Sequence, residues 1–156
     1  MERILQQGLE TWGLPTDAIP RLQEFSRLLL EKNRVMNLTA ITDPADVARL
    51  HFLDCASLLT IADFRGKSVV DVGTGAGFPG MPLRLLEPDF DLTLLDSLGK
   101  RVEWLTELCR ELDLPDVVLL PLGRLAAAER VAAFLLRFGQ AQSRAGGNPL
   151  EFVLPL

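Results

Sequence analysis

The spacing of apolar residues divides the chain into a helical first part and an alternating second part. Between residues 17 and 34, apolar side chains recur at steps of three and four, the period of a helix with one buried face. A second helix is predicted over residues 44–61, because Asp43 can cap its first turn and Pro44 suits the first helical position. Residues 1–65 show little strand pattern, and we therefore predict a helical amino-terminal extension.

From Lys67 onward, short apolar runs alternate with segments of helical period. Continuous apolar strands that alternate with helices are typical of a parallel sheet covered on both faces. We therefore predict a parallel, doubly wound α/β domain over residues 66–156. Its strands are expected at residues 68–72, 91–95 and 117–120, with helices at 78–86 and 98–112 between them.

The pattern becomes weaker after Leu120. Residues 122–136 are rich in Ala and Leu and predict a further helix, and residues 141–143 could begin a fourth strand. Four strands with nothing after them would form a thin sheet with an exposed edge. We therefore expect a partial sheet whose carboxy-terminal strands are missing.

The net charge of −5 argues against a protein that coats nucleic acid by bulk electrostatics. Positive charges nevertheless gather in the first third of the chain, which leaves open a local basic face toward RNA or ordinary solvated helix faces. The residues concerned are Arg21, Arg27, Lys32, Arg34 and Arg49.

Several functional classes lack the residues they need. The single histidine, His51, leaves no multi-histidine metal site, and Cys55 and Cys109 lack the paired spacing of a zinc site, so we expect buried free thiols and no metal. No Ser-His-Asp arrangement suggests itself. No apolar run approaches the roughly 18 residues of a membrane span, and we predict a soluble cytoplasmic monomer.

The most informative segment is a glycine-rich turn that follows the first predicted strand. Asp71 lies near the end of this strand, and Gly73, Gly75 and Gly77 follow at alternate positions. Glycine is needed where the backbone takes a positive φ and where a ligand approaches the main chain closely. A ligand is therefore expected to lie against this turn, although a turn that binds nothing is the plain structural alternative.

Two nucleotide ligands compete for the turn. Residues 75–80 match the dinucleotide pattern GxGxxG, with Asp96 about 20 residues further on, which would suit an NAD-dependent oxidoreductase. The longer pattern, Asp71 followed by GxGxG, looks like the first motif of class I methyltransferases, where the carboxylate orients the cationic methionine part of the cofactor. In either interpretation Asp96 can accept hydrogen bonds from the two ribose hydroxyls.

Four motifs together make the chain recognisable. They are residues 37–42 (NLTAIT), 51–54 (HFLD), 71–80 (DVGTGAGFPG) and 94–101 (LLDSLGKR). In order and spacing they resemble the RsmG (GidB) family of bacterial small-subunit ribosomal RNA methyltransferases, over about residues 1–124. The resemblance implies a class I fold with a helical extension, and transfer of the methyl group of S-adenosyl-L-methionine to N7 of a guanine in 16S ribosomal RNA.

The resemblance also implies which residues surround the cofactor. It places Gly73 and Phe78 in contact with S-adenosyl-L-methionine, with Asp71, Gly75, Gly77 and Asp96 around it. The family usually has an acidic contact to the adenine after Gly123 and Arg124, where this chain has Leu125 and Ala126. Arg144 stands at the position of the arginine that contacts the cofactor.

The substrate side is expected to involve Asn37, His51, Asp54, Lys100 and Arg101. The partner would be small-subunit ribosomal RNA or a ribosomal particle. The alternative for His51 is a structural histidine whose hydrogen bonds are made within its own helix region. The alternative for Lys100 and Arg101 is two surface side chains that contact only solvent. Guanine N7 carries an accessible lone pair, so no general base is required and no catalytic residue is predicted. A truncated fold that binds ribosomal RNA or nothing remains a third, non-enzymatic alternative.

Overall fold

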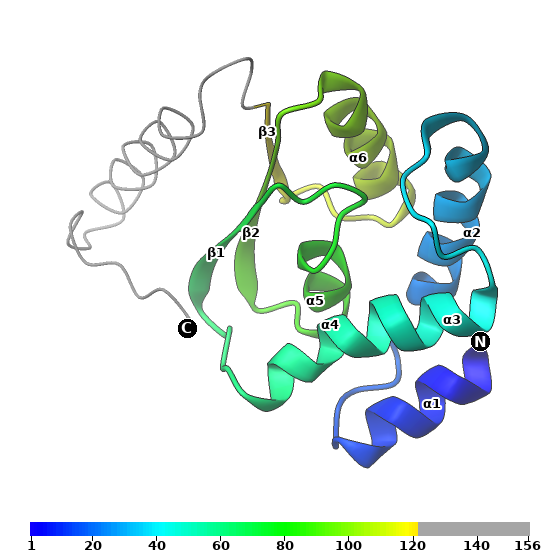
Figure 1. The fold of residues 1–156 in the computed structure, drawn as a ribbon. Coiled ribbons are helices and arrows are strands. Elements are labelled where there is room, and N and C mark those ends of the chain that lie inside the picture. Colours follow the sequence, from blue (N-terminus) through cyan, green and yellow to red (C-terminus); the bar gives the residue numbers. More distant parts are fainter. Residues whose placement is uncertain (122–156) are drawn as a thin grey trace. The chain divides into compact units, whose positions relative to one another are not determined.

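Three parallel strands form the sheet in the part of the chain that the structure, a computed structural model, describes, residues 1–121 (Figure 1). They are β1 (Lys67–Val72), β2 (Phe90–Asp96) and β3 (Val118–Pro121), in the spatial order β1-β2-β3. Helix α5 (Gly80–Leu86) connects β1 to β2, and α6 (Gly99–Glu111) connects β2 to β3. The predicted α/β arrangement is confirmed for these elements.

Residues 1–65 form the helical extension that the apolar period predicts. It begins with α1 (Glu2–Thr11) and α2 (Ile19–Met36). One continuous helical segment follows, made of α3 (Pro44–Val47), a π-helical stretch (Ala48–Leu53), α4 (Asp54–Ser57) and a short 3₁₀ turn (Leu58–Thr60). The sequence indicated this helix but not its π-helical stretch.

The predicted cap of the second helix is present. The Asp43 side chain accepts hydrogen bonds from the backbone amides of Ala45 and Asp46, at 2.8 and 3.1 Å. These amides have no partner within the helix, so a side-chain acceptor satisfies them. Pro44 follows as the first helical residue, as expected.

The extension and the sheet share one hydrophobic core. Phe25 of α2 and Phe52 of the π-helical stretch are fully buried, together with Met81 of α5 and Leu105 of α6. Complete burial of such side chains contributes about 1.5–3 kcal/mol each to folding. The boundary after residue 65 between an extension and an α/β domain therefore stays a prediction, because no gap in the core marks it.

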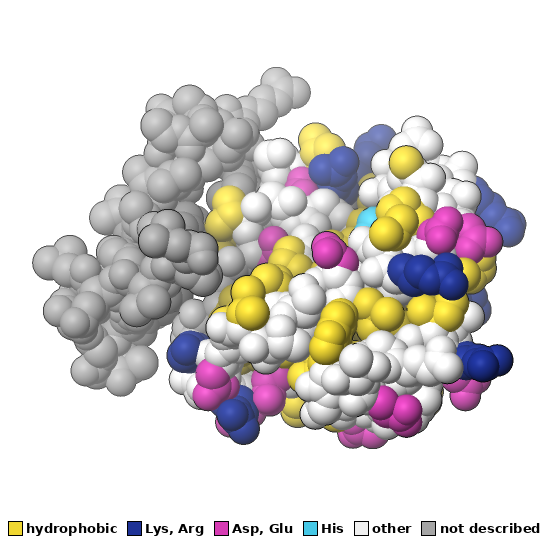
Figure 2. Space-filling view, turned by 60° about the horizontal axis from the view of Figure 1, so that its bottom comes forward, with side chains coloured by type: hydrophobic (Ala, Val, Ile, Leu, Met, Phe, Trp, Pro, Cys, Tyr) yellow, Lys and Arg dark blue, Asp and Glu magenta, His cyan; other side chains and the backbone are white. Residues whose placement is uncertain are grey.

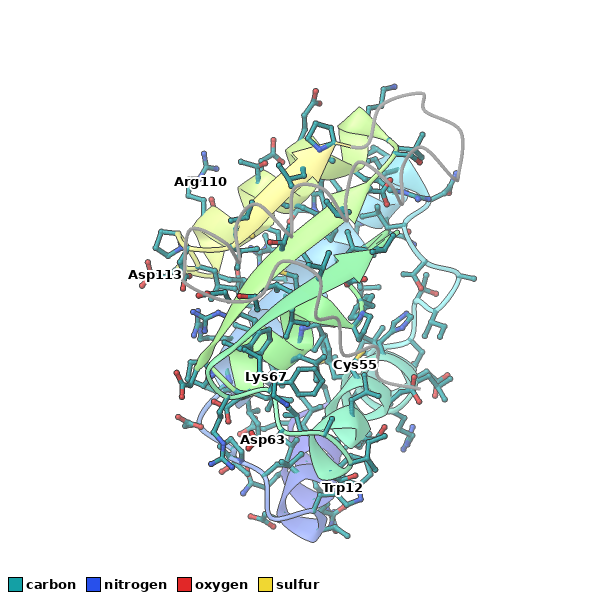
Figure 3. The ribbon with its side chains drawn as sticks, turned by 90° about the vertical axis from the view of Figure 1, so that its left-hand side faces the viewer. Trp12, Cys55, Asp63, Lys67, Arg110 and Asp113 are labelled. Carbon is teal, nitrogen blue, oxygen red and sulfur yellow. The ribbon has the colours of Figure 1, made fainter. Side chains whose placement is uncertain are left out.

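The two faces of the sheet differ among the described residues. Helices α5 and α6 lie on one face, and Figure 3 views the strands from the opposite side. On that opposite face, Val72 of β1 is 57% exposed and Val118 of β3 is 48% exposed. The helix predicted at residues 122–136 and the strand predicted at 141–143 lie outside the described residues.

Most basic residues of the extension have acidic neighbours. On the face shown in Figure 2, charged side chains of both signs are interspersed with hydrophobic ones. Such mixing is typical of solvated helix faces and not of one basic RNA-binding surface. The ion pairs are Arg27 with Glu24 and Glu31, Lys32 with Glu107, Arg49 with Asp46, and Arg65 with Asp63.

Candidate cofactor-binding site

The glycine turn follows β1 at the carboxyl edge of the sheet, and its backbone shows why glycine is needed. Gly73, Gly75 and Gly77 have positive φ angles of 81°, 58° and 98°. A Cβ on Gly73 would meet no atom within 4 Å, and on Gly75 only the carbonyl oxygen of Gly73 at 3.8 Å. These two residues therefore leave open space beside the backbone, into which a ligand can come close.

Gly77 is required for packing as well as for conformation. Its Cβ would lie 2.9 Å from Cγ of Met81 and 3.1 Å from Cδ2 of Leu105, both side chains of the core. The turn is thus exposed to solvent at Gly73 and packed against the core at Gly77.

Asp71 holds the turn in place. Its Oδ2 accepts a hydrogen bond from the Thr74 hydroxyl at 2.8 Å and another from the Gly80 amide at 2.9 Å. Burial raises the pKa of this carboxyl above its usual range, and the charge of Asp96 contributes in the same direction. The sequence suggested only that Asp71 orients a ligand; the structure adds that it connects the beginning of the turn to the first residue of α5.

Asp96 ends β2 and lies beside the same turn. Its Oδ2 accepts from the Gly75 amide at 2.9 Å, and its Oδ1 accepts from the Leu98 amide at 2.8 Å. Nη1 of Arg101 is 3.6 Å from Oδ2. The residue is only 2% exposed. Each carboxylate oxygen has two lone pairs, so both retain capacity for a further donor.

Phe78, which follows the last glycine of the turn, stacks on two other rings. The ring centroids of Phe78 and His51 are 4.5 Å apart, and those of Phe78 and Phe25 are 5.2 Å apart, each pair at an interplanar angle of 11°. The faces of the Phe78 ring are thus engaged inside the protein. Any contact of this residue with a cofactor would have to come from its backbone or its ring edge.

His51 also has its contacts inside the protein. This agrees with the alternative interpretation, in which His51 is a structural residue of its helix and does not contact RNA. Its Nε2 lies 2.8 Å from the hydroxyl oxygen of Thr39, and its ring rests on Phe78. Burial lowers the pKa of His51, and the nearby Asp54 carboxylate opposes that shift. The ring is half-buried, and its lowered pKa favours the neutral form.

The other predicted substrate residues differ in exposure. Asn37 is exposed and ends α2 in the left-handed conformation, with φ of 49°. Asp54 and Lys100 are also exposed, whereas Arg101 is half-buried and directed to Asp96. The structure thus leaves three of the five available to a partner at the surface. The predicted residues Leu125, Ala126 and Arg144 lie outside the described part of the chain.

Thr39 and Asn33 belong to this region although the sequence analysis did not single them out. The Asn33 side chain accepts from the Thr39 amide and donates to the Thr39 carbonyl, both at 2.9 Å. The Thr39 hydroxyl in turn accepts from the Ile41 amide at 3.0 Å. The only signal in the sequence was that Thr39 lies within the NLTAIT motif.

Comparison with known proteins gives a consistent result. A family model described as "rRNA small subunit methyltransferase G" (GidB) matches residues 18–131. The chain belongs to this family. The family resemblance inferred from the four sequence motifs is thereby confirmed, and so is the fold class that it implied.

Individual relatives carry the same description. The chain is 46% identical over 117 residues to the "Ribosomal RNA small subunit methyltransferase G" of Alkaliphilus metalliredigens, an alignment that covers 73% of this chain and 49% of the relative. It is 43% identical over 113 residues to that of an Anaeromyxobacter strain, covering 71% and 52%. With the protein of Caldanaerobacter subterraneus it shares 38% over 154 residues, covering 97% and 64%. The chain thus spans about half of the length of the first two relatives.

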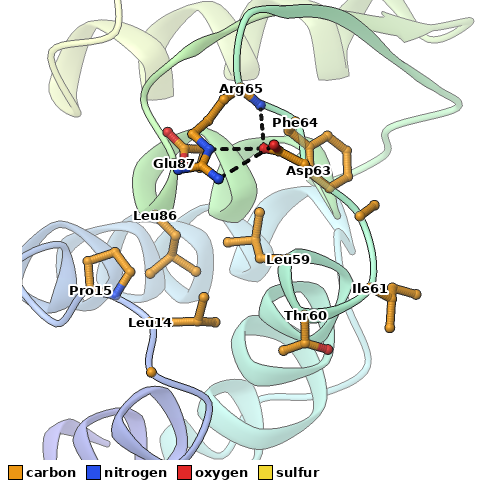
Figure 4. A pocket seen from close by; sticks show the side chains of 12 residues that line it. Leu14, Pro15, Leu59, Thr60, Ile61, Asp63, Phe64, Arg65, Leu86 and Glu87 are labelled. Carbon is orange, nitrogen blue, oxygen red and sulfur yellow. Dashed lines mark hydrogen bonds and ion pairs between the residues drawn. The ribbon is translucent and has the colours of Figure 1, made fainter.

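The glycine turn of this RsmG family member does not line either of two hollows found among the described residues. One, of about 490 Å³, lies near the amino ends of β1 and β2, between Leu14, Leu59 and Leu86, with Asp63 and Arg65 paired at its rim (Figure 4). The other, of about 460 Å³, lies between α2 and α6. The candidate site therefore rests on the exposed backbone of the turn and its two carboxylates.

Residues 1–121 contain neither a metal-binding cluster nor a membrane-spanning helix. No group of three or more His, Cys, Asp or Glu residues there is placed to hold a metal ion. None of the helices described is long and apolar enough to cross a membrane. Cys55 and Cys109 are buried free thiols, as predicted.

The lowered pKa of His51 predicts how stability depends on pH. The unfolded chain binds this proton more tightly than the folded one, so the contribution of His51 to the free energy of unfolding is complete above its ordinary value of 6.5. It is lost as the pH falls through the lower folded value. We expect His51→Phe, which keeps an aromatic ring against Phe78, to reduce the loss of stability on acidification, measured by urea unfolding across this range. Equal pH dependence in both proteins would contradict the prediction.

Proposed function

We propose that this chain is part of an S-adenosyl-L-methionine-dependent methyltransferase that modifies guanine N7 in the 16S ribosomal RNA of the small subunit. The observation that carries the proposal is the glycine turn, with open backbone at Gly73 and Gly75 and a carboxylate at the end of each adjoining strand. Membership of the RsmG family supports it.

The residues present fit the proposed cofactor. Asp71 uses Oδ2 for the turn, and its Oδ1 makes no hydrogen bond within residues 1–121, so that oxygen remains for a cationic amino group. Asp96 retains lone pairs for ribose hydroxyls, beside the space left open at Gly75. Bound S-adenosyl-L-methionine would supply an electrophilic methyl group on a positively charged sulfur.

The protein's own contribution to the reaction would be placement. Guanine N7 already has a free lone pair, so no side chain has to remove a proton before the methyl group is transferred. Holding the reacting atoms in line can supply roughly 7–11 kcal/mol. Asn37, Asp54 and Lys100 are exposed and remain the candidates for contacts with RNA, whereas Arg101 is half-buried beside Asp96. His51, expected at the same surface, would contribute through Phe78.

The proposed partner is small-subunit ribosomal RNA or a ribosomal particle, met in the bacterial cytoplasm by a monomer of this protein. The net charge of −5 and the paired arginines of the extension favour recognition by a few local contacts over broad electrostatic attraction. An NAD-dependent oxidoreductase would use the same turn and the same Asp96, and the family match argues against it.

Calorimetric titration of the 156-residue chain tests the proposal. We expect saturable binding of S-adenosyl-L-methionine and S-adenosylhomocysteine, and none of NAD. Asp71→Ala should weaken binding by at least about tenfold, because a charged hydrogen bond contributes about 1.5–3 kcal/mol. Asp63→Ala, at an exposed carboxylate away from the turn, is the matched control and should leave binding unchanged.

Two results would contradict the proposal. Absence of binding in a chain shown to be folded by circular dichroism would leave the non-enzymatic alternative. Binding of NAD in preference to S-adenosyl-L-methionine would favour the oxidoreductase.

A further inference from the structure

Three stacked rings connect the helical extension to the glycine turn. Phe25 belongs to α2, His51 to the π-helical stretch and Phe78 to the turn itself, and both stacked pairs are close to parallel. Phe25 is fully buried and His51 and Phe78 are partly buried. The last residue of the turn is therefore placed by two segments that are distant from it in the sequence.

The ring of His51 is itself held by the loop after α2. The Thr39 hydroxyl accepts from the Ile41 amide, so its own proton is free to be donated to Nε2 of a neutral His51. Asn33 fixes Thr39 through both backbone groups. One chain of contacts thus runs from α2 through Thr39 and His51 to Phe78.

Phe78 is tied directly to the backbone of the turn. The amides of Gly77 and Phe78 both donate to the carbonyl oxygen of Thr74, at 2.9 and 3.1 Å. Thr74 is buried and also donates its hydroxyl to Asp71. A displacement of the Phe78 ring would therefore move the peptide groups on which the proposed cofactor rests.

We propose that Thr39 and His51 are positioning residues, which fix Phe78 and through it the glycine turn, so that the helical extension sets the affinity for the cofactor. The inference rests on the proposed function and deepens it. It assigns His51 a role without contact to RNA, and it gives Thr39, a residue outside the turn, a measurable effect on ligand binding.

The single histidine of the chain makes the test direct, because the carbon-bound protons of its ring give one set of NMR signals. Thr39→Val removes the hydroxyl but keeps the shape, and Thr39→Ser restores the hydroxyl. Thr42→Val, at an exposed threonine of the same loop, is the matched control. The readouts are the His51 ring signals, the amide signals of Gly75 and Gly77 without ligand, and the calorimetric Kd for S-adenosyl-L-methionine.

We expect Thr39→Val to shift the His51 signals and the glycine amides and to weaken cofactor binding about 3- to 10-fold, the effect of one hydrogen bond. Thr39→Ser should recover the original values, and Thr42→Val should not change them. Should Thr39→Val fail to fold, His51→Phe, which keeps a ring against Phe78, is compared with His51→Leu, which removes it. Both variants lose the acceptor of the Thr39 hydroxyl, so both are expected to move the glycine amides and weaken binding, the leucine variant more because it also loses the ring that stacks on Phe78.

The outcomes separate this inference from the proposed function. Unmoved glycine amides, or an unchanged Kd in a Thr39→Val protein whose His51 signals have shifted, overturn the positioning role. If the unmodified chain binds no cofactor, the proposed function fails; shifted glycine amides in Thr39→Val would then still support the positioning of the turn, and unmoved ones would refute it.

Discussion

Gly80→Ala is expected to lower the free energy of unfolding by about 1–3 kcal/mol, the usual effect of inserting a methyl group into a tightly packed site. The added Cβ would lie 2.7 Å from Cδ2 of Leu94 and 2.9 Å from Oδ2 of Asp71. Leu94 is a buried residue of β2, and the Asp71 oxygen accepts a hydrogen bond from the Gly80 amide. Neither side chain can therefore move away from the added methyl group without losing contacts. The first residue of α5 therefore has to be glycine for the helix to approach the sheet.

Gly99→Ala is the matched control, because Gly99 is the first residue of α6 and its Cβ would meet no atom within 4 Å. This variant should be neutral or slightly more stable, since alanine restricts the unfolded chain. Urea unfolding of both variants gives the comparison. Equal stability of the two variants would show that α5 does not depend on close contact with Asp71 and Leu94.

Asp96→Ala is expected to weaken binding of S-adenosyl-L-methionine by about 100-fold or more. Two hydrogen bonds from ribose hydroxyls to a carboxylate contribute at least about 1.5 kcal/mol each, and about 1.4 kcal/mol corresponds to a factor of ten. The substitution also removes the acceptor of the Gly75 and Leu98 amides. The effect should therefore exceed that of Asp71→Ala, which leaves the ribose contacts in place.

Asp91→Ala is the control for this prediction, because Asp91 belongs to the same strand but is exposed near its opposite end. Calorimetry should show unchanged affinity in this variant. An Asp96→Ala protein that is folded and binds the cofactor as tightly as the unmodified chain would exclude Asp96 from the site.

These residues fix the glycine turn from several directions. Asp71 accepts a hydrogen bond from the first residue of α5, and Asp96 accepts one from the Gly75 amide. At the end of the turn, Phe78 stacks on His51. A backbone that is held before the ligand arrives loses less conformational freedom on binding, which favours affinity. The backbone at Gly73 is thus accessible to a ligand although the conformation of the turn is fixed.

The sequence by itself determined the order of elements and the place of the site. Strand, turn and helix follow from local period and from glycine, whose conformational role is a property of single residues. The carboxyl ends of neighbouring parallel strands meet at one edge, which brought Asp71 and Asp96 to the same turn. The family likewise followed from motifs that are contiguous in the chain.

Only the tertiary structure decided what several of these side chains do. The contacts of Thr39 with His51, and of His51 with Phe78, join residues far apart in the sequence, and no local period encodes such pairs. The π-helical stretch that carries His51 was also not visible in the apolar pattern. Arg101, expected at an RNA surface, lies beside Asp96 for the same reason: the direction of a side chain depends on what packs around its helix.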